Sequence, residues 1–134
     1  QDRLERIKSQ SEKLGVPVIT IQGDVAHFEP EESYDVVLST MVLHFLNQES
    51  VHKAVAVMQG HTNPGGLNVV SVYTSENPSG LRSYLFAPGE LKKIYEGWEI
   101  LEYEEGLGPE IENPKDGGPS RRFSAKLIAR RPVL

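Results

Sequence analysis

The fold is decided by Tyr34-Asp35-Val36-Val37-Leu38-Ser39, an apolar and β-branched run. Its apolar residues do not alternate with polar ones, which is typical of a central parallel strand that is buried on both faces. A second short run of this kind, Val18-Ile19-Thr20-Ile21, lies upstream and ends at Gly23-Asp24. Strands of this type belong to sheets that helices cover, so the two runs predict an α/β protein.

Helices are predicted on either side of these strands. Residues 2–14 carry apolar positions on one face among many charges, and predict a surface helix. Asn47 is placed to cap a second helix, in which Val51, Val55 and Met58 recur on one side. Both segments have the length and spacing of ordinary helices in a globular domain.

Further elements follow toward the C-terminus. The turn Asn63-Pro64-Gly65-Gly66 leads into a predicted strand at 67–74, and Pro88 opens a short helix that Gly97 closes. Residues 98–104 and 122–130 predict two more strands, and a loop rich in Gly, Pro and Asn spans residues 106–119 between them. The connector between the strands at 18–21 and 34–39 is short for a parallel crossover, so other strands are expected between these two in the sheet.

Composition narrows the functional classes. The chain has 134 residues, 38% hydrophobic and 25% charged, with a net charge of −5 and no cysteine. Dispersed basic residues argue against nucleic acid and anionic membranes as partners, and no apolar run approaches the ~20 residues that cross a bilayer. We therefore expect a cytoplasmic protein with a small-molecule substrate. Because the first methionine, Met41, lies inside a predicted core element, translation is expected to start further upstream.

Four motifs follow one another along the chain: the loop Ser39–Leu46, the Pro-Gly-Gly turn at Pro64–Asn68, the segment Glu90–Glu99 and the last strand, Arg122–Arg130. Together they resemble class I S-adenosylmethionine-dependent methyltransferases, and most closely the tellurite-resistance TehB-type family. The loop before that strand reads Gly108-Pro109-Glu110-Ile111, where the family has a Gly-Glu-Leu-His-like motif. It therefore lacks the histidine of the family.

The resemblance implies that residues 1–134 are the C-terminal portion of a single methyltransferase domain. The family sheet has the strand order 3-2-1-4-5-7-6, so this chain would hold strands three to seven of a Rossmann-like sheet, mostly parallel with an antiparallel C-terminal strand pair. The N-terminal strand-helix-strand cofactor unit, with its glycine-rich turn, would be absent. Gly106-Leu107-Gly108 follows a predicted strand but opens a Pro-rich loop, not a helix.

The resemblance also implies residues for S-adenosylmethionine. Asp24 would accept a hydrogen bond from the adenine amino group, and the amide of Val25 would meet the ring. Asp24 after Gly23 also fits a simple Asx-turn. The end of the central strand would floor the pocket, although such residues also pack in cores; together with the aromatic ring after them these candidates are Ser39, Thr40, Met41 and Phe45.

Substrate-side candidates carry structural alternatives as well. His44 is a general-base candidate, although a lone histidine is more often structural. Tyr84, Leu85 and Phe86 would form a substrate lid or, equally, a hydrophobic plug. Arg121 and Arg122 would hold an oxyanion, or would simply end a strand in solvent. The four histidines lack the i, i+4 spacing of a helical zinc pair, so no metal site is predicted.

These observations leave three functional hypotheses. The first is a methyltransferase for a small tellurium, selenium or thiol-type nucleophile, since transfer from a sulfonium needs alignment more than proton abstraction. The second is a truncated or degenerate domain without catalysis, stabilised by self-association, as in a homodimer joined through exposed strand edges or strand swapping. The third is a nucleotide-binding oxidoreductase, against which the Pro-Gly-Gly turn and the antiparallel final pair argue.

Overall fold

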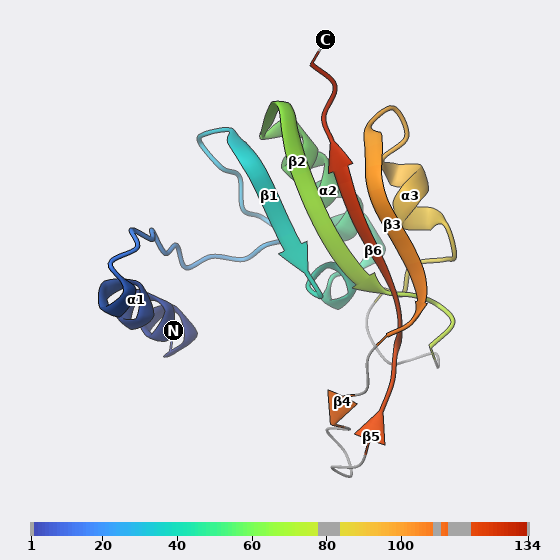
Figure 1. Ribbon diagram of the computed structural model, residues 1–134, viewed down its shortest axis with the longest axis horizontal. Coiled ribbons are helices and arrows are strands. Elements are labelled where there is room, and N and C mark those ends of the chain that lie inside the picture. The colour runs from blue at the N-terminus through green and yellow to red at the C-terminus, as the bar shows by residue number, and fades with distance from the viewer. Residues whose placement is uncertain (1, 78–83, 109–110, 113–118, 134) are drawn as a thin grey trace.

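The computed structural model describes residues 2–77, 84–108, 111–112 and 119–133. In chain order its elements are α1 (Asp2–Leu14), β1 (Tyr34–Thr40), the 3-10 helix η1 (Leu43–Phe45), α2 (Gln48–Gly60), β2 (Thr62–Tyr73), α3 (Glu90–Ile94), β3 (Glu99–Leu107), β4 (Ile111–Glu112), β5 (Pro119–Ser120) and β6 (Phe123–Arg130). Four strands form one sheet, and the short β4 and β5 pair separately (Figure 1).

The main sheet has the order β1-β2-β6-β3, which is the order that the resemblance implies for strands four, five, seven and six. Only β1 and β2 are parallel among these pairs, because β6 lies between β2 and β3 and is antiparallel to both. The expectation of a mostly parallel sheet is therefore wrong for this chain. The antiparallel pair at the C-terminus is confirmed.

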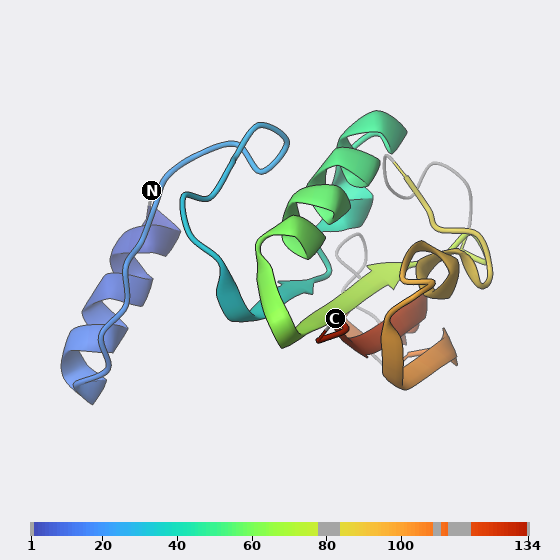
Figure 2. The ribbon, with the colours of Figure 1, turned by 90° about the horizontal axis from the view of Figure 1, so that it is seen from above.

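Helices α2 and α3 lie on the same face of the sheet, while α1 stands apart from it (Figure 2). The core forms where α2 and α3 meet β2 and β6. Its buried hydrophobic residues are Leu43, Val51, Ala54, Val55, Val70, Val72, Phe86, Leu91, Tyr95, Ala125, Leu127 and Ala129. The alternating burial of β2 and β6 confirms the alternation read from the sequence of the last strand.

Two expectations about the first strands are wrong. The run Val18–Ile21 is not a strand, and Ile19 exposes 90% of its surface. A strand exists only where a neighbour pairs with it, and none of the described residues does so for this run. The expected central strand, β1, lies at the edge of the sheet, where Val36 and Leu38 are 54% and 63% exposed.

Helix α2 begins after Asn47 as predicted, whereas the short helix α3 differs at both ends and stops at Ile94 instead of reaching Gly97. Asn47 caps α2, since its Oδ1 accepts a hydrogen bond from the Ser50 amide at 2.9 Å. The helix predicted to open at Pro88 starts only at Glu90, because Gly89 adopts a left-handed conformation with φ of 77°. The strand predicted at 67–74 extends back to Thr62 and so includes the Pro-Gly-Gly segment.

The side chain of Asn77 connects the C-terminal end of β2 with the N-terminal end of β6. The Asn77 amide group donates to the Phe123 carbonyl at 2.7 Å, and its Oδ1 accepts from the Phe123 amide at 2.8 Å. Asn77 thus imitates a strand backbone and continues the pairing where β2 ends and β6 begins. The carboxyl end of β2 is held in place as a result.

Candidate functional site

A cavity of about 480 Å³ lies along β1, on the side where α2 packs. Its lining is mainly apolar. It comes from the connector (Val25, Phe28, Pro30), from β1 (Tyr34, Val37, Leu38, Ser39, Thr40), from the loop after β1 (Val42, Leu43), and from α2 with the residue after it (Ala54, Val57, Met58, His61). Three of the predicted cofactor residues, Val25, Ser39 and Thr40, are therefore brought together. A flat, mostly apolar ring of a ligand suits such a lining.

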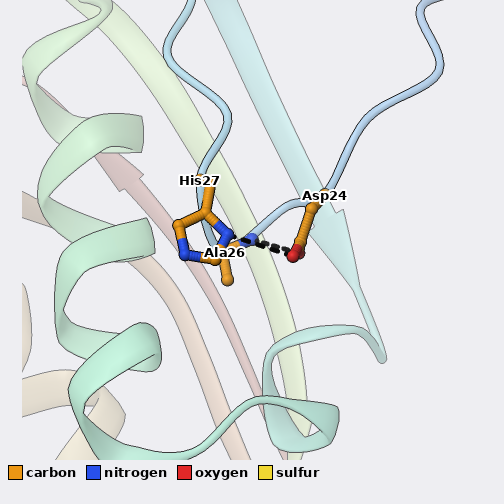
Figure 3. A network of polar contacts seen from close by, with 3 residues as sticks. All are labelled: Asp24, Ala26 and His27. Carbon is orange, nitrogen blue, oxygen red and sulfur yellow. Dashed lines mark hydrogen bonds and ion pairs between the residues drawn. The ribbon is translucent and has the colours of Figure 1, made fainter.

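Asp24 stands in a tight turn (Figure 3), next in sequence to Val25, which lines the cavity. Its Oδ1 accepts a hydrogen bond from the Ala26 amide at 2.9 Å, and its Oδ2 lies 3.0 Å from Nδ1 of His27. The Ala26 amide first, and then the imidazole of His27, lower the pKa of Asp24 below its ordinary value. Asp24 is thus an exposed carboxylate in an Asx-turn, with lone pairs that can still accept a ligand's donor.

The backbone is strained where β1 ends. Met41 has a φ of 56°, and among the described residues it is the non-glycine residue with a positive φ. Its amide donates to the Ser71 carbonyl at 2.8 Å, so the chain turns away from the sheet while it is still anchored to β2. Left-handed non-glycine residues are uncommon and often mark binding sites. The strain falls within the predicted cofactor loop.

His44 is buried and built into the structure. Its Nδ1 accepts a hydrogen bond from the Tyr73 amide at 3.2 Å, and the two rings stack with centroids 4.4 Å apart. The His44 carbonyl accepts from the Tyr84 amide at 3.1 Å. The next ring, Phe45, is 58% exposed and lies 4.8 Å from the His44 ring. These contacts agree with the structural alternative for His44, and Phe45 does not line the cavity.

The segment before α3 contains a plug and a partly exposed phenol. Phe86 is fully buried and belongs to the core, so its side chain is a hydrophobic plug and not part of a lid. Tyr84 is half-buried, and its hydroxyl donates to the Glu90 carboxylate. Burial, with that hydrogen bond and the Glu90 charge, raises the pKa of Tyr84 to about 12. Residues 78–83, which precede Tyr84, lie outside the described residues.

The two arginines before β6 lie away from this cavity. Arg121 Nε donates to the Gly108 carbonyl at 2.8 Å, and an Arg122 guanidinium nitrogen lies 3.3 Å from the Arg121 carbonyl. Arg121 lines a separate hollow with Lys126 and Glu104, along β3 and β6. The structure does not bring either arginine together with Val25 and Ser39. Residues 109–110 of the family-like motif lie outside the described residues.

Sequence reasoning missed the α2 side of the cavity. Ala54, Val57 and Met58 line it, although only the periodicity of this helix, and no motif, pointed to an apolar surface there. In the described part of the chain no group of three or more His, Cys, Asp or Glu side chains could hold a metal ion. Among those same residues no helix is both long and apolar enough to span a bilayer.

Comparison with known proteins places these features in a family. The family model described as "Tellurite resistance protein TehB" matches residues 2–124. A curated relative from Haemophilus influenzae (strain 10810), "Probable S-adenosyl-L-methionine-dependent methyltransferase TehB", is 34% identical over 128 residues. The alignment covers 93% of this chain and 45% of the relative, so the chain spans about half the relative's length.

Solved structures agree with this match. TehB from Haemophilus influenzae superposes with a TM-score of 0.88 and 31% identity, over 98% of this chain and 47% of that one. The N-methyltransferase NodS from Bradyrhizobium japonicum WM9, in complex with S-adenosyl-L-homocysteine, gives a TM-score of 0.61 at 18% identity, over 82% of this chain and 52% of that one. The second likeness concerns the fold alone.

Proposed function

The chain belongs to the TehB family, whose curated relatives are probable S-adenosyl-L-methionine-dependent methyltransferases, and we propose that it forms the adenine-binding and substrate-facing portion of such an enzyme. The observation that carries the proposal is the cavity along β1, which joins Val25 to Ser39 and Thr40. Asp24, next in sequence to Val25, has an exposed carboxylate.

The residues present fit an adenosyl group. The apolar lining suits the two faces of an adenine ring, and the Asp24 carboxylate is a suitable acceptor for its amino group. The ordinary pKa of an aspartate is already far below neutral pH and that of Asp24 is lowered further, so its carboxylate is ionised and can accept at neutral pH. Met41 would hold the backbone close to the rest of the cofactor, since its left-handed turn is fixed to β2.

Bound S-adenosylmethionine supplies a methyl group that its sulfonium already activates. The chain's own residues then have to bind, orient and exclude water. The candidate base, His44, is buried, and its Nδ1 already accepts a hydrogen bond from the Tyr73 amide. This favours a methyl-accepting substrate that does not need a base to remove a proton. We therefore propose a soft, anionic acceptor, of the tellurium, selenium or thiol type.

Calorimetric titration with S-adenosyl-L-homocysteine tests this function on the 134-residue chain. We expect a micromolar Kd, and roughly tenfold weaker binding for Asp24→Ala, which removes one charge-assisted hydrogen bond. Asp35→Ala is the matched control. Asp35 is also an exposed carboxylate that accepts a hydrogen bond, from Asn63, but it does not line the cavity. Absence of binding by the unmodified chain would refute the proposed cofactor site.

A second candidate function is a non-catalytic domain that self-associates. It is favoured by the position of β1, whose apolar Val36 and Leu38 are exposed at the edge of the sheet. An open edge of this kind can pair with the same strand of another copy. A dimer in sedimentation equilibrium, together with no binding of S-adenosyl-L-homocysteine, would favour this candidate over the first.

A further inference from the structure

One edge of β2 is covered in turn by three different groups. β1 pairs with it as far as Ser71, whose carbonyl accepts from Met41. The next amide along this edge, that of Tyr73, donates to Nδ1 of His44. Beyond it, the Phe86 amide donates to the Tyr73 carbonyl at 3.1 Å, and the Ser75 amide donates to the Phe86 carbonyl at 2.7 Å.

The His44 ring thus fills the place of a strand residue between β1 and Phe86. Its Nδ1 accepts the amide that a neighbouring carbonyl would otherwise accept, so the neutral ring carries its proton on Nε2. Stacking of the ring on Tyr73 fixes its direction. The ring is 1% exposed, and loss of the acceptor of the part-buried Tyr73 amide would be unfavourable.

The same residue reaches the segment before α3. The His44 carbonyl accepts from Tyr84, whose hydroxyl donates to Glu90, and Glu90 also accepts from the Ala87 amide at 2.8 Å. One residue therefore connects the loop after β1 with residues 84–87 and the first turn of α3. In the proposed function these two regions are the cofactor side and the substrate side.

We propose that His44 is a positioning residue that holds the substrate-side segment, residues 84–86, in register with the cofactor-side loop, residues 39–45. Binding in the cofactor loop is then linked to the order of residues 84–86, although these belong to different parts of the sequence. The proposal rests on the proposed function for its meaning in catalysis. Its structural content is a joint between two regions through one imidazole.

Two substitutions at His44 distinguish the effect of the hydrogen-bond acceptor Nδ1 from the effect of the stacked aromatic ring. His44→Phe keeps an aromatic ring over Tyr73 but removes the acceptor, whereas His44→Asn places an amide oxygen near the position of Nδ1 and removes the ring. The matched control is His52→Phe, since His52 is exposed on α2. Amide hydrogen exchange, resolved by residue with nuclear magnetic resonance, reports on each hydrogen bond separately.

In the protein without ligand, we expect His44→Phe to speed exchange of the Tyr73 amide by roughly tenfold or more. Because the joint connects both regions, the amides of Met41 and Phe86 should also exchange faster. His44→Asn should restore most of the protection, and His52→Phe should change none of the three. Faster exchange at Tyr73 alone, or unchanged exchange at all three amides, would overturn the proposal.

Addition of S-adenosyl-L-homocysteine gives the functional readout. In the unmodified chain and in His44→Asn, the ligand should slow exchange at Tyr84 and Phe86, and in His44→Phe it should bind without this effect. Binding that leaves Tyr84 and Phe86 unchanged in the unmodified chain would overturn the linkage. If the ligand does not bind at all, the proposed function fails, and the exchange rates measured without ligand still decide the role of His44.

Discussion

Tyr95 and Asn68 are joined by a buried hydrogen bond of 2.7 Å, in which the tyrosine hydroxyl donates to Oδ1 of the amide. The Asn68 amide nitrogen donates to the Thr62 hydroxyl at 2.7 Å, and that hydroxyl donates to the Met58 carbonyl at 2.6 Å. This line of hydrogen bonds runs from the end of α3 across β2 to α2. It therefore fixes both helices on one face of the sheet.

Tyr95→Phe tests this connection. The substitution removes one hydroxyl and leaves the fully buried Asn68 oxygen without its donor, so we expect a loss of about 1–3 kcal/mol in the free energy of unfolding. Urea denaturation followed by circular dichroism measures it. Tyr34→Phe is the control, because Tyr34 is 44% exposed on β1 and its loss of a hydroxyl should change stability by less than about 0.5 kcal/mol. Equal effects at the two sites would contradict the prediction.

Gly66→Ala tests why the Pro-Gly-Gly segment needs a glycine. A Cβ at Gly66 would lie 2.7 Å from the Asp35 carbonyl oxygen and 2.8 Å from that of Asn63, and both atoms belong to backbone. Since β1 and β2 would have to separate locally, we expect a destabilisation of about 2–4 kcal/mol, measured as a fall in the urea midpoint.

Gly60→Ala is the matched control for that substitution. Gly60 ends α2, and a Cβ there meets no atom within 4 Å. Because alanine favours a helix over glycine, this variant should be unchanged or stabilised by at most about 1 kcal/mol. A destabilisation of Gly60→Ala similar to that of Gly66→Ala would show that the crowding at Gly66 is not the cause.

Several elements could be predicted because their sequence patterns are local. The alternation of residues 122–130 predicted a strand and Asn47 predicted a helix cap; both depend only on neighbours in the sequence, and both are confirmed. The strand expected at Val18–Ile21 is wrong because its existence depends on partners that the described residues do not supply. The mostly parallel sheet is wrong for the same reason, since without that strand β1 and β2 are the one parallel pair in the main sheet of the described residues.

The candidate site was predictable only in part. Val25, Ser39 and Thr40 were implied by the resemblance to the family, and they do line one cavity. The contribution of His44 could not be read from the sequence, because it depends on the Tyr73 amide, 29 residues away. The burial of Phe86 likewise follows from its pairing with the end of β2, and not from its neighbours in the loop.

Alkaline titration tests the contact between Tyr84 and Glu90. The pKa of Tyr84 is raised from 10.0 to about 12, so the neutral phenol is favoured in the folded protein. Its stabilising effect is fully present below pH 10.0, and is lost as the pH rises through about 12. Phenolate absorbance should therefore contain a step near pH 12 from Tyr84, while burial holds the pKa of Tyr95 and Tyr103 higher still, and the loss of this one step in Tyr84→Phe identifies it.

Glu90→Gln provides the control for that titration. The amide keeps the size of the side chain but removes the negative charge, so the pKa of Tyr84 should fall toward its ordinary value. Burial, which is the largest cause of the raised pKa, remains. A step that stays near pH 12 in this variant would attribute the whole effect to burial and would contradict a role for Glu90.

Leu38→Lys tests whether the exposed edge of the sheet causes self-association. Leu38 is 63% exposed on β1, so a charge there should change the stability of the monomer by less than about 0.5 kcal/mol. Two copies that pair through β1 would bring two such lysines close together, and the substitution also removes apolar surface. We therefore expect self-association, measured by sedimentation equilibrium, to weaken by about tenfold or more.

Val133→Lys adds the same charge at another place. Val133 is 75% exposed and follows β6, which β2 separates from β1 in the sheet, so this variant should associate as the unmodified chain does. If both variants weaken association equally, net charge is responsible and not the edge strand. If neither does, β1 is not the contact surface, and the non-catalytic candidate loses the observation that favours it.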